Sequence, residues 1–228
     1  MINAAWADRV STDSFGACAI FSVGRADFVF RHIESTKAGL ASFWILDTPV
    51  TQEQWISVMQ KNPSDGSQDP LRPVDRVSFV ECQKFIDRLN GLRPGLFCSI
   101  PTDAQWGEAC CSDGRRGPEH VDEDCWHSGN TNGECPRVRL KAPNRYGVYD
   151  MLGGVWEWCD NWMCEVDLSE NTGVLTRYSN TQKVLRGTSW DSPVNNYYFG
   201  IRGGFTPTNR SNKIGFRVAV ADTFTSNL

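Results

Sequence analysis

Glycine and proline are spread along this whole chain, and their distribution constrains the fold more than any other feature of the sequence. The 228 residues include 20 Gly, 11 Pro and 9 Trp, and no segment gathers the Gly and Pro residues into a linker. Because both residue types interrupt regular elements, long helices and long strands are not expected. The sequence therefore predicts a loop-rich fold in which large aromatic side chains carry much of the core packing.

Three short helices are indicated by their start signals. A Ser or Thr side chain at a helix start can accept a hydrogen bond from the third helical N–H, while Glu or Gln at that third position bonds back. This pattern occurs at Thr51–Gln54, Ser78–Glu81 and Thr102–Gln105. The predicted helices are Gln52–Gln60, Ser78–Asn90 and Thr102–Cys110.

The remaining apolar residues lie in short pieces that predict short strands. These pieces are Phe28–Ile33, Phe43–Leu46, Val155–Cys159, Val184–Leu185 and Gly215–Ala221. The stretch Asp113–Asn144 has few apolar residues, so we expect a long ordered loop there. The pattern predicts one α+β domain over residues 1–228, with residues 1–27 as an N-terminal extension.

Composition excludes several classes of function. The formal charge is −4 and no basic run is present, so a nucleic-acid partner is not expected. No apolar stretch approaches the roughly 18 residues of a spanning helix, and we expect no transmembrane segment. The first ten residues include Asp8 and Arg9, which do not suit a targeting peptide.

Nine cysteines are present, an odd number, so at least one thiol is free or pairs between chains. None forms a C-x-x-C pair, and the spacing does not suit zinc. One or two disulfides in an oxidising compartment and a set of buried thiols both remain open. The cysteines are Cys18, Cys82, Cys98, Cys110, Cys111, Cys125, Cys135, Cys159 and Cys164.

Familiar catalytic motifs are absent: the sequence has no G-x-S-x-G, P-loop, H-E-x-x-H or dinucleotide-binding glycine pattern. The histidines His32 and His120 are interpreted as structural and surface residues, respectively. The acidic run Asp122–Asp124 suits a hard cation, but a solvated loop face is favoured.

Six motifs follow one another in a fixed order: Thr48–Thr51, Pro73–Ser78, Ile100–Trp106, Asn144–Cys159, Val184–Trp190 and Ile214–Val218. Within them, Trp156 and Trp158 share one strand face, while Arg186 and Arg217 can donate to loop carbonyls. Together the motifs resemble the formylglycine-generating-enzyme (sulfatase-modifying-factor) branch of the C-type lectin fold. The resemblance runs from about Phe43 to Ala221 and implies that loop-rich fold.

The resemblance argues against the family's oxidase activity in this chain. Members that oxidise a cysteine use a Cys pair between the last two motifs, where this sequence has Ser192 and Tyr197 by spacing from Trp190. A hydroxyl and a phenol cannot replace thiolates as ligands for copper(I). We therefore expect no enzyme activity and no cofactor. Calcium at Glu157 stays open, although Gly154 stands where the family tends to place an Asn calcium ligand.

The segment Asp191–Asn212 lacks Lys, Glu, Gln, Met and Trp. Every residue type in it can be specified by a codon ending in C, as randomised adenines in asparagine codons would produce. With its flanking motifs, this region resembles the variable proteins of diversity-generating retroelements, whose lectin-type members include a treponemal variable protein. An accidental composition of a Gly/Asn/Ser-rich loop is the alternative. The variable region is expected over residues 184–221.

The resemblance and the composition predict a non-enzymatic binding protein with a diversified surface, because aromatic and small polar side chains together suit recognition. The alternatives are a cysteine oxidase of the formylglycine-generating type, a degenerate metal-dependent relative, and a structural surface domain. Expected are a protein or cell-surface ligand, a monomer, and display on the cell surface or secretion, as a lipoprotein whose signal is not in this sequence. The predicted binding residues are Asp191, Ser192, Asn195, Tyr197, Tyr198, Ile201, Gly203, Gly204, Phe205, Thr206, Thr208, Asn209 and Ser211.

Overall fold

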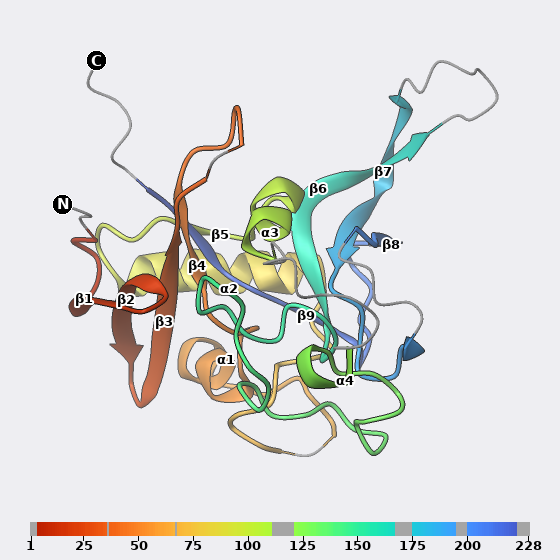
Figure 1. Cartoon of the computed structure of the whole chain (residues 1–228), viewed down its shortest axis with the longest axis horizontal. Coiled ribbons are helices and arrows are strands. Elements are labelled where there is room, and N and C mark those ends of the chain that lie inside the picture. Colours follow the sequence, from red (N-terminus) through yellow and green to blue (C-terminus); the bar gives the residue numbers. More distant parts are fainter. Residues whose placement is uncertain are drawn as a thin grey trace.

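A computed structural model of the chain describes residues 4–35, 37–66, 68–110, 121–166, 175–194 and 200–222. It has a six-stranded sheet in the order β1-β2-β3-β4-β10-β5 and a four-stranded sheet in the order β8-β7-β6-β9 (Figure 1). The strands are β1 (Arg9–Asp13), β2 (Gly16–Val23), β3 (Ala26–Ile33), β4 (Phe43–Leu46), β5 (Cys98–Ser99), β6 (Trp156–Val166), β7 (Leu175–Arg186), β8 (Gly203–Phe205), β9 (Ile214–Phe216) and β10 (Ala219–Ala221). The helices are α1 (Gln52–Met59), α2 (Phe79–Leu92), α3 (Asp103–Ala109) and α4 (Val121–Asp124).

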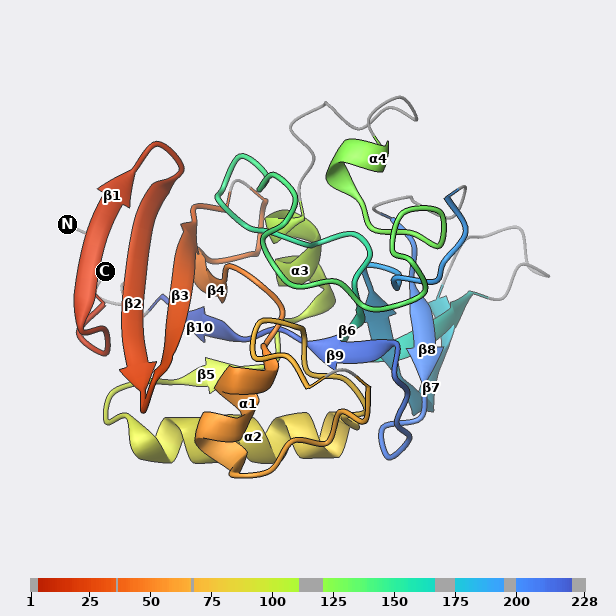
Figure 2. The ribbon, with the colours of Figure 1, turned by 90° about the horizontal axis from the view of Figure 1, so that it is seen from below.

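The three capping boxes are confirmed. Thr51, Ser78 and Thr102 each accept a hydrogen bond from the third helical N–H, and the Gln or Glu at that position bonds back in each case. Helices α1 and α2 pack along one side of the molecule, opposite the loops that follow α4 (Figure 2). The start signals therefore located the helices correctly, because caps act locally and do not depend on tertiary contacts.

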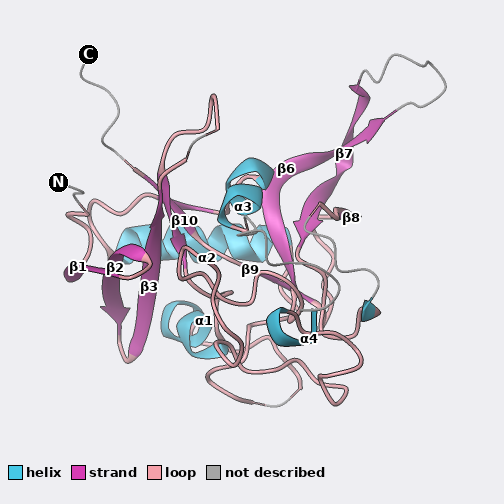
Figure 3. Ribbon diagram, in the orientation of Figure 1, coloured by secondary structure: helices cyan, strands magenta, loops and turns pink. Residues whose placement is uncertain are grey.

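The long loop predicted over Asp113–Asn144 contains one helical turn, α4, that the sequence pattern did not reveal. This helix has only four residues, all at least partly exposed, so it shows no apolar period. The rest of the described chain from residue 125 to β6 is drawn almost entirely as loop (Figure 3). Residues 111–120, which include His120, lie outside the described residues.

The N-terminal segment contributes two strands that the sequence analysis did not predict. Strands β1 and β2 form a hairpin that extends the sheet from β3. Ala19 and Phe21 of β2 are fully buried, and Trp6 packs edge-to-face on Phe21 with ring centroids 6.0 Å apart. The small residues Ala and Ser in β2 weaken its alternating pattern, which is why the strand was missed.

The predicted C-terminal strand Gly215–Ala221 is wrong as a single element. It forms two strands in different sheets: β9 pairs in parallel with β6, and β10 pairs with β4 and β5. Arg217 lies at the crossing, fully buried, and donates to the carbonyl oxygens of Leu46 and Tyr149 at 3.0 and 2.9 Å. The crossing connects the two sheets, and Arg217 satisfies one loop carbonyl, that of Tyr149, as predicted, and one at the end of β4, that of Leu46.

Aromatic side chains fill the core where the sheets meet the helices. Trp55 of α1 stacks on Phe85 of α2 at 5.2 Å, and Phe216 of β9 meets Phe85 edge-to-face at 5.3 Å. Trp158 is fully buried and donates through Nε1 to the carbonyl of Val77 at 3.0 Å. Large rings can bridge irregular spacings between loops, which explains the high Trp and Phe content.

Buried thiols account for five cysteines in the described part of the chain: Cys18, Cys82, Cys98, Cys135 and Cys159. Burial raises the pKa of each of these thiols above its usual value. They behave as small apolar residues of the core. Cys110 and Cys125 are buried as well, and Cys111 and Cys164 lie in stretches where no side chain is described.

The longest described helix, α2, has 14 residues, and no described helix is both long and apolar enough to cross a membrane.

Candidate functional site

A buried ion pair joins strand β6 to the crossing that follows β9. Both carboxylate oxygens of Glu157 accept from the Arg217 guanidinium, at 2.9 and 3.0 Å, and Trp106 Nε1 donates to the same carboxylate at 2.7 Å. Neither charged side chain is exposed, so the pair is shielded from water. These contacts occupy the oxygens that the sequence analysis considered for calcium.

The two ends of Asp191–Ser211, which we call the candidate segment, are held together. Trp190, just before the segment, donates through Nε1 to the carbonyl of Asn212, just after it, at 3.3 Å. The Trp190 backbone N–H donates to Gly154 at 2.9 Å, and Thr131 donates to the Trp190 carbonyl at 2.9 Å. The segment therefore leaves and rejoins the frame at neighbouring points.

Asp191 and Ser192 form a hydrogen-bonded turn at the start of the segment. The Ser192 hydroxyl accepts from the Ser189 N–H at 3.1 Å, and the Ser189 hydroxyl donates to Asp191 at 2.8 Å. Asp191 also pairs with Lys213. Burial acts to raise the pKa of Asp191, but the bonds from Lys213 and Ser189 outweigh it, so its pKa lies below the usual value.

Strand β8 contains Gly203, Gly204 and Phe205 and pairs with β7. Phe205 is half-buried: its ring lies 6.2 Å from that of Trp158 and packs against the core. Its ring therefore helps to close the core, whereas the sequence analysis treated it as contact area for a ligand. Ile201 is also half-buried.

The turn after β8 has exposed side chains. Thr208 and Asn209 are exposed and Thr206 is half-buried, with the Asn209 N–H donating to the Thr206 carbonyl at 3.0 Å. Among the described residues, no hydrogen bond involves the side chain of Thr206, Thr208 or Asn209. Ser211 differs, because its hydroxyl accepts from the N–H of Lys213 at 3.2 Å. The first three side chains are therefore available to a ligand.

Other residues of the segment bind it to the helices. Arg202 pairs with Asp103 of α3 at 2.5 Å, and the Pro207 carbonyl accepts from the N–H of Val80 in α2 at 3.3 Å. Arg210 donates to both oxygens of Glu81, the capping-box residue of α2, at 2.8 and 2.5 Å. These contacts of Arg202, Pro207 and Arg210 fix the backbone of the segment next to the neighbouring residues.

Three predicted binding residues, Asn195, Tyr197 and Tyr198, lie outside the described residues. The described members therefore fall into three groups: a turn at Asp191 and Ser192, a strand with Phe205 packed inward, and an open turn around Thr208.

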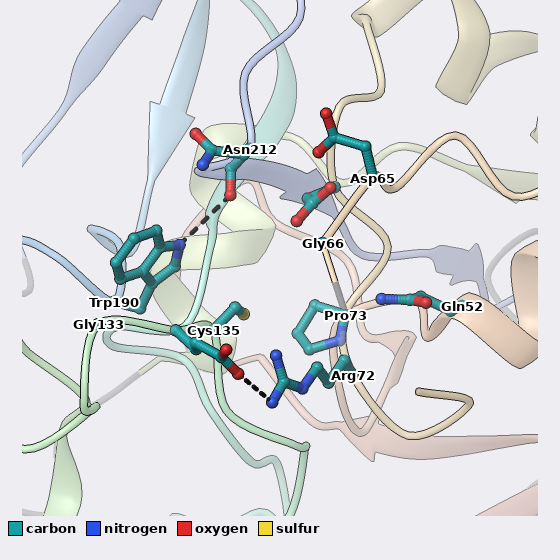
Figure 4. Close-up of a pocket in the computed structure, with 11 residues that line it drawn as sticks. Gln52, Asp65, Gly66, Arg72, Pro73, Gly133, Cys135, Trp190 and Asn212 are labelled. Carbon is teal, nitrogen blue, oxygen red and sulfur yellow. Dashed lines mark hydrogen bonds and ion pairs between the residues drawn. The ribbon is translucent and has the colours of Figure 1, made fainter. Parts of the chain in front are cut away.

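The structure also contains a pocket of about 150 Å³ that the sequence analysis missed. Figure 4 shows Trp190 and Cys135 on one side and Gln52 and Asp65 on the other. Asp75, Glu134 and Asn212 also line it. The lining residues come from segments far apart in the sequence, so no local pattern marked the pocket, although the Pro73–Ser78 motif contains Asp75.

The described histidines have structural partners. His32 contacts Asp222 at 2.8 Å and His127 contacts Asp122 at 2.6 Å through Nε2. His127 is buried, so this contact holds α4 against the following loop. Within the described ranges, no group of three or more His, Cys, Asp or Glu side chains is arranged to hold a metal ion.

Comparisons with known proteins agree with this architecture. Residues 21–222 match the sulfatase-modifying factor enzyme 1-like domain. The chain is 30% identical to the formylglycine-generating enzyme of Streptomyces coelicolor over 68% of its own length and 55% of the enzyme's. It is 32% identical to the inactive C-alpha-formylglycine-generating enzyme 2 of Bos taurus over 92% of this chain and 69% of that protein. This chain therefore spans little more than half the length of the Streptomyces coelicolor enzyme.

Among solved structures, the chain is similar to Treponema denticola variable protein 1. The TM-score is 0.75 at 22% identity, covering 89% of this chain and 98% of that one. This likeness concerns the fold, which is the loop-rich α+β C-type lectin fold of the formylglycine-generating-enzyme type. With the match over residues 21–222, it leads to one conclusion: the chain belongs to the sulfatase-modifying factor enzyme 1-like domain family.

Proposed function

We propose that this chain is a non-enzymatic binding protein that presents the candidate segment to a protein or cell-surface ligand, in the manner of a diversity-generating retroelement variable protein. One observation carries the proposal. Arg202, Pro207 and Arg210 tie the segment to helices α2 and α3, whereas Thr208 and Asn209 between them are exposed. A rigid frame with open polar positions suits a recognition surface.

The glycines of β8 support the same proposal. A Cβ added at Gly203 would lie 3.5 Å from Leu185, an ordinary contact, and one added at Gly204 would meet only the movable end of Gln182 and the Met163 side chain. Neither glycine adopts a left-handed backbone. Both positions can therefore accept other residues without rearranging the frame, as a diversified surface requires.

The chemistry of Ser192 argues against an oxidase. Its hydroxyl is held in the turn by Ser189. By its spacing from Trp190, the family resemblance places Ser192 where oxidising members use a cysteine. A serine hydroxyl supplies neither the thiolate that binds copper(I) nor a group that forms a disulfide. The relatives include an enzyme and an inactive member, so sequence similarity alone does not decide whether this chain is an enzyme.

The first test is the DNA around the coding region. We expect a near-repeat of the stretch encoding residues 191–212, with adenines at the codon positions that differ, close to a reverse-transcriptase gene. A locus with neither feature would remove the retroelement part of the proposal.

The second test is enzymatic. The copper-loaded protein should not oxidise a cysteine-containing peptide with oxygen above the rate of a boiled sample. A Ser192→Cys variant serves as the matched comparison, because it restores one of the two thiols. Turnover by the unmodified chain well above background would overturn the non-enzymatic assignment.

The proposal extends to setting and assembly. A displayed binder acts at the cell surface, and we propose that this domain works there as a monomer without a cofactor. Light scattering on the purified protein tests whether it is a monomer. Protease accessibility on intact source cells tests whether it lies at the cell surface.

A further inference from the structure

The pocket lined by Trp190 and Asn212, which flank the candidate segment, has an excess of negative charge. Three carboxylates, Asp65, Asp75 and Glu134, line it together with a single guanidinium, that of Arg72. Arg72 pairs with Glu134 at 2.7 Å, and Asp65 pairs with Arg76. Asp75 is the remaining carboxylate and takes part in neither of these ion pairs.

Asp75 has an oxygen without a partner. Its Oδ1 atom is buried and makes no hydrogen bond to any described residue, and the Nε atom of Arg72, which also lines the pocket, is likewise buried without a hydrogen bond. Leaving a charged acceptor unpaired in a protein interior is costly, so such an atom points to a missing partner. Burial raises the pKa of Asp75 to about 6 against the lowering effects of Ser64, Arg76 and Arg72.

An aromatic wall completes the pocket. Trp190 lines the pocket, with its Nε1–H bonded to Asn212 (Figure 4). An indole ring attracts cations as well as apolar groups. A carboxylate, an indole and a volume of about 150 Å³ together suit the end of one basic side chain.

We propose that this pocket binds the guanidinium or ammonium group of a basic side chain of the ligand, with Asp75 as its anion and Trp190 beside it. The inference rests on the proposed function and names the chemistry of its ligand. Trp190 and Asn212 flank the candidate segment, and none of the thirteen predicted binding residues lines the pocket. The pocket is therefore formed by residues outside the candidate segment, so the pocket remains the same when residues of the segment change.

A metal ion is the main competing occupant, since carboxylates also bind hard cations. Two of the three carboxylates already pair with arginines, which leaves too few free oxygens for the six to eight ligands of calcium. An organic cation needs only one strong acceptor and a surface to lie against. The observations therefore favour an organic cation.

The test uses methylguanidinium as the probe and the indole N–H resonance of Trp190 as the readout, assigned with Trp190→Phe. N-methylurea, its neutral analogue, is the matched control ligand. Asp75→Asn removes the anion with little change in shape, and Asp27→Asn removes a carboxylate on β3 outside the pocket. All titrations are made at constant ionic strength.

We expect methylguanidinium to shift the Trp190 resonance saturably, with a Kd of about 1–10 mM for so small a ligand. Asp75→Asn should weaken this binding about tenfold or more, because a charge-assisted hydrogen bond is lost. Asp27→Asn should leave it unchanged, and N-methylurea should give no saturable shift.

Equal binding of N-methylurea to the unmodified chain would overturn the inference even if Asp75→Asn failed to fold. A saturable shift with calcium but none with methylguanidinium would overturn it in favour of a metal site. The probe does not require the natural ligand, so this result is separate from the proposed function. A ligand that depends on Thr208 and Asn209 could be found while the pocket fails the test.

Discussion

Glu157 of β6 and Arg217, the residue directly after β9, form a doubly hydrogen-bonded ion pair at 2.9 and 3.0 Å, and neither side chain is exposed. Trp106 of α3 donates to the same carboxylate, and Arg217 also donates to the carbonyl of Leu46 in β4 and to that of Tyr149 in a loop. This pair therefore joins β6 to a helix, to a strand of the other sheet and to a loop.

Removing one member of this pair should destabilise the protein strongly. Glu157→Gln leaves Arg217 as a buried charge without a counter-ion, which costs about 3–5 kcal/mol of unfolding free energy. Glu134→Gln is the matched control, because it breaks an ion pair whose carboxylate is 62% exposed and should cost less than about 1 kcal/mol. Urea denaturation measures both, and equal small losses would contradict the structural role of Glu157.

Calcium should not stabilise the chain. Both oxygens of Glu157 already accept hydrogen bonds from Arg217, and Gly154 offers no side-chain oxygen. We expect the Tm to agree within about 1 °C in millimolar calcium and in EDTA, since a ligand that does not bind the folded state cannot raise its stability. A rise of several degrees with calcium would show that a site exists.

Asp75 should make stability depend on pH in a defined direction. Its pKa is about 6 in the folded chain against a reference of 3.8, so between these values the folded state holds more protons. The unfolding free energy contributed by this group therefore rises as the pH falls from 7 to 4. Asp75→Asn should be more stable than the unmodified chain at pH 7, with the difference shrinking toward pH 4.

The measurement is a series of denaturation curves for both proteins across this range, with Asp27→Asn as a control carboxylate. A constant difference between Asp75→Asn and the unmodified chain would mean that Asp75 titrates normally.

Glycines in the candidate segment and in the frame should respond differently to substitution. Gly204→Ser should change the unfolding free energy by less than about 0.5 kcal/mol, because the new Cβ meets only side chains, nearest of all the flexible end of Gln182. At Gly215 the new Cβ would lie 2.6 Å from the backbone oxygen of Val74, so Gly215→Ser should cost about 1–3 kcal/mol. Thermal unfolding compares the two, and equal losses would argue against a substitutable β8.

Phe205 and Thr208 provide a second comparison within the segment. Phe205→Ala removes a half-buried ring from contact with Trp158 and should lower stability by about 1–3 kcal/mol. Thr208→Ala removes an exposed side chain and should change stability by less than about 0.5 kcal/mol. Similar losses for both would show that Thr208 also belongs to the packed frame.

Several elements were predictable because their signals are local. The caps at Thr51, Ser78 and Thr102 depend on residues three positions apart, and the observed helices begin where these caps predicted. Strand β4 matches its predicted range for a similar reason, since all four of its residues are apolar and buried. The order of the six motifs was sufficient to predict the family and the fold.

Features that depend on distant contacts were not predictable in this way. The segment Gly215–Ala221 is apolar except for Arg217, and the chain passes from one sheet to the other at this residue, because Glu157 and two carbonyls accept hydrogen bonds from its guanidinium. The inward packing of Phe205 likewise depends on Trp158, which is far away in the sequence.

By itself, the sequence determined the short helices, the loop-rich class, the family and the position of the candidate segment, because caps, composition and ordered motifs are properties of neighbouring residues. The tertiary structure alone decided which side chains of that segment are open and which are packed. It also brought Asp75, Glu134 and Trp190 around one pocket. Burial and charge pairing between distant segments exist only once the chain has folded, so they leave no local pattern in the sequence.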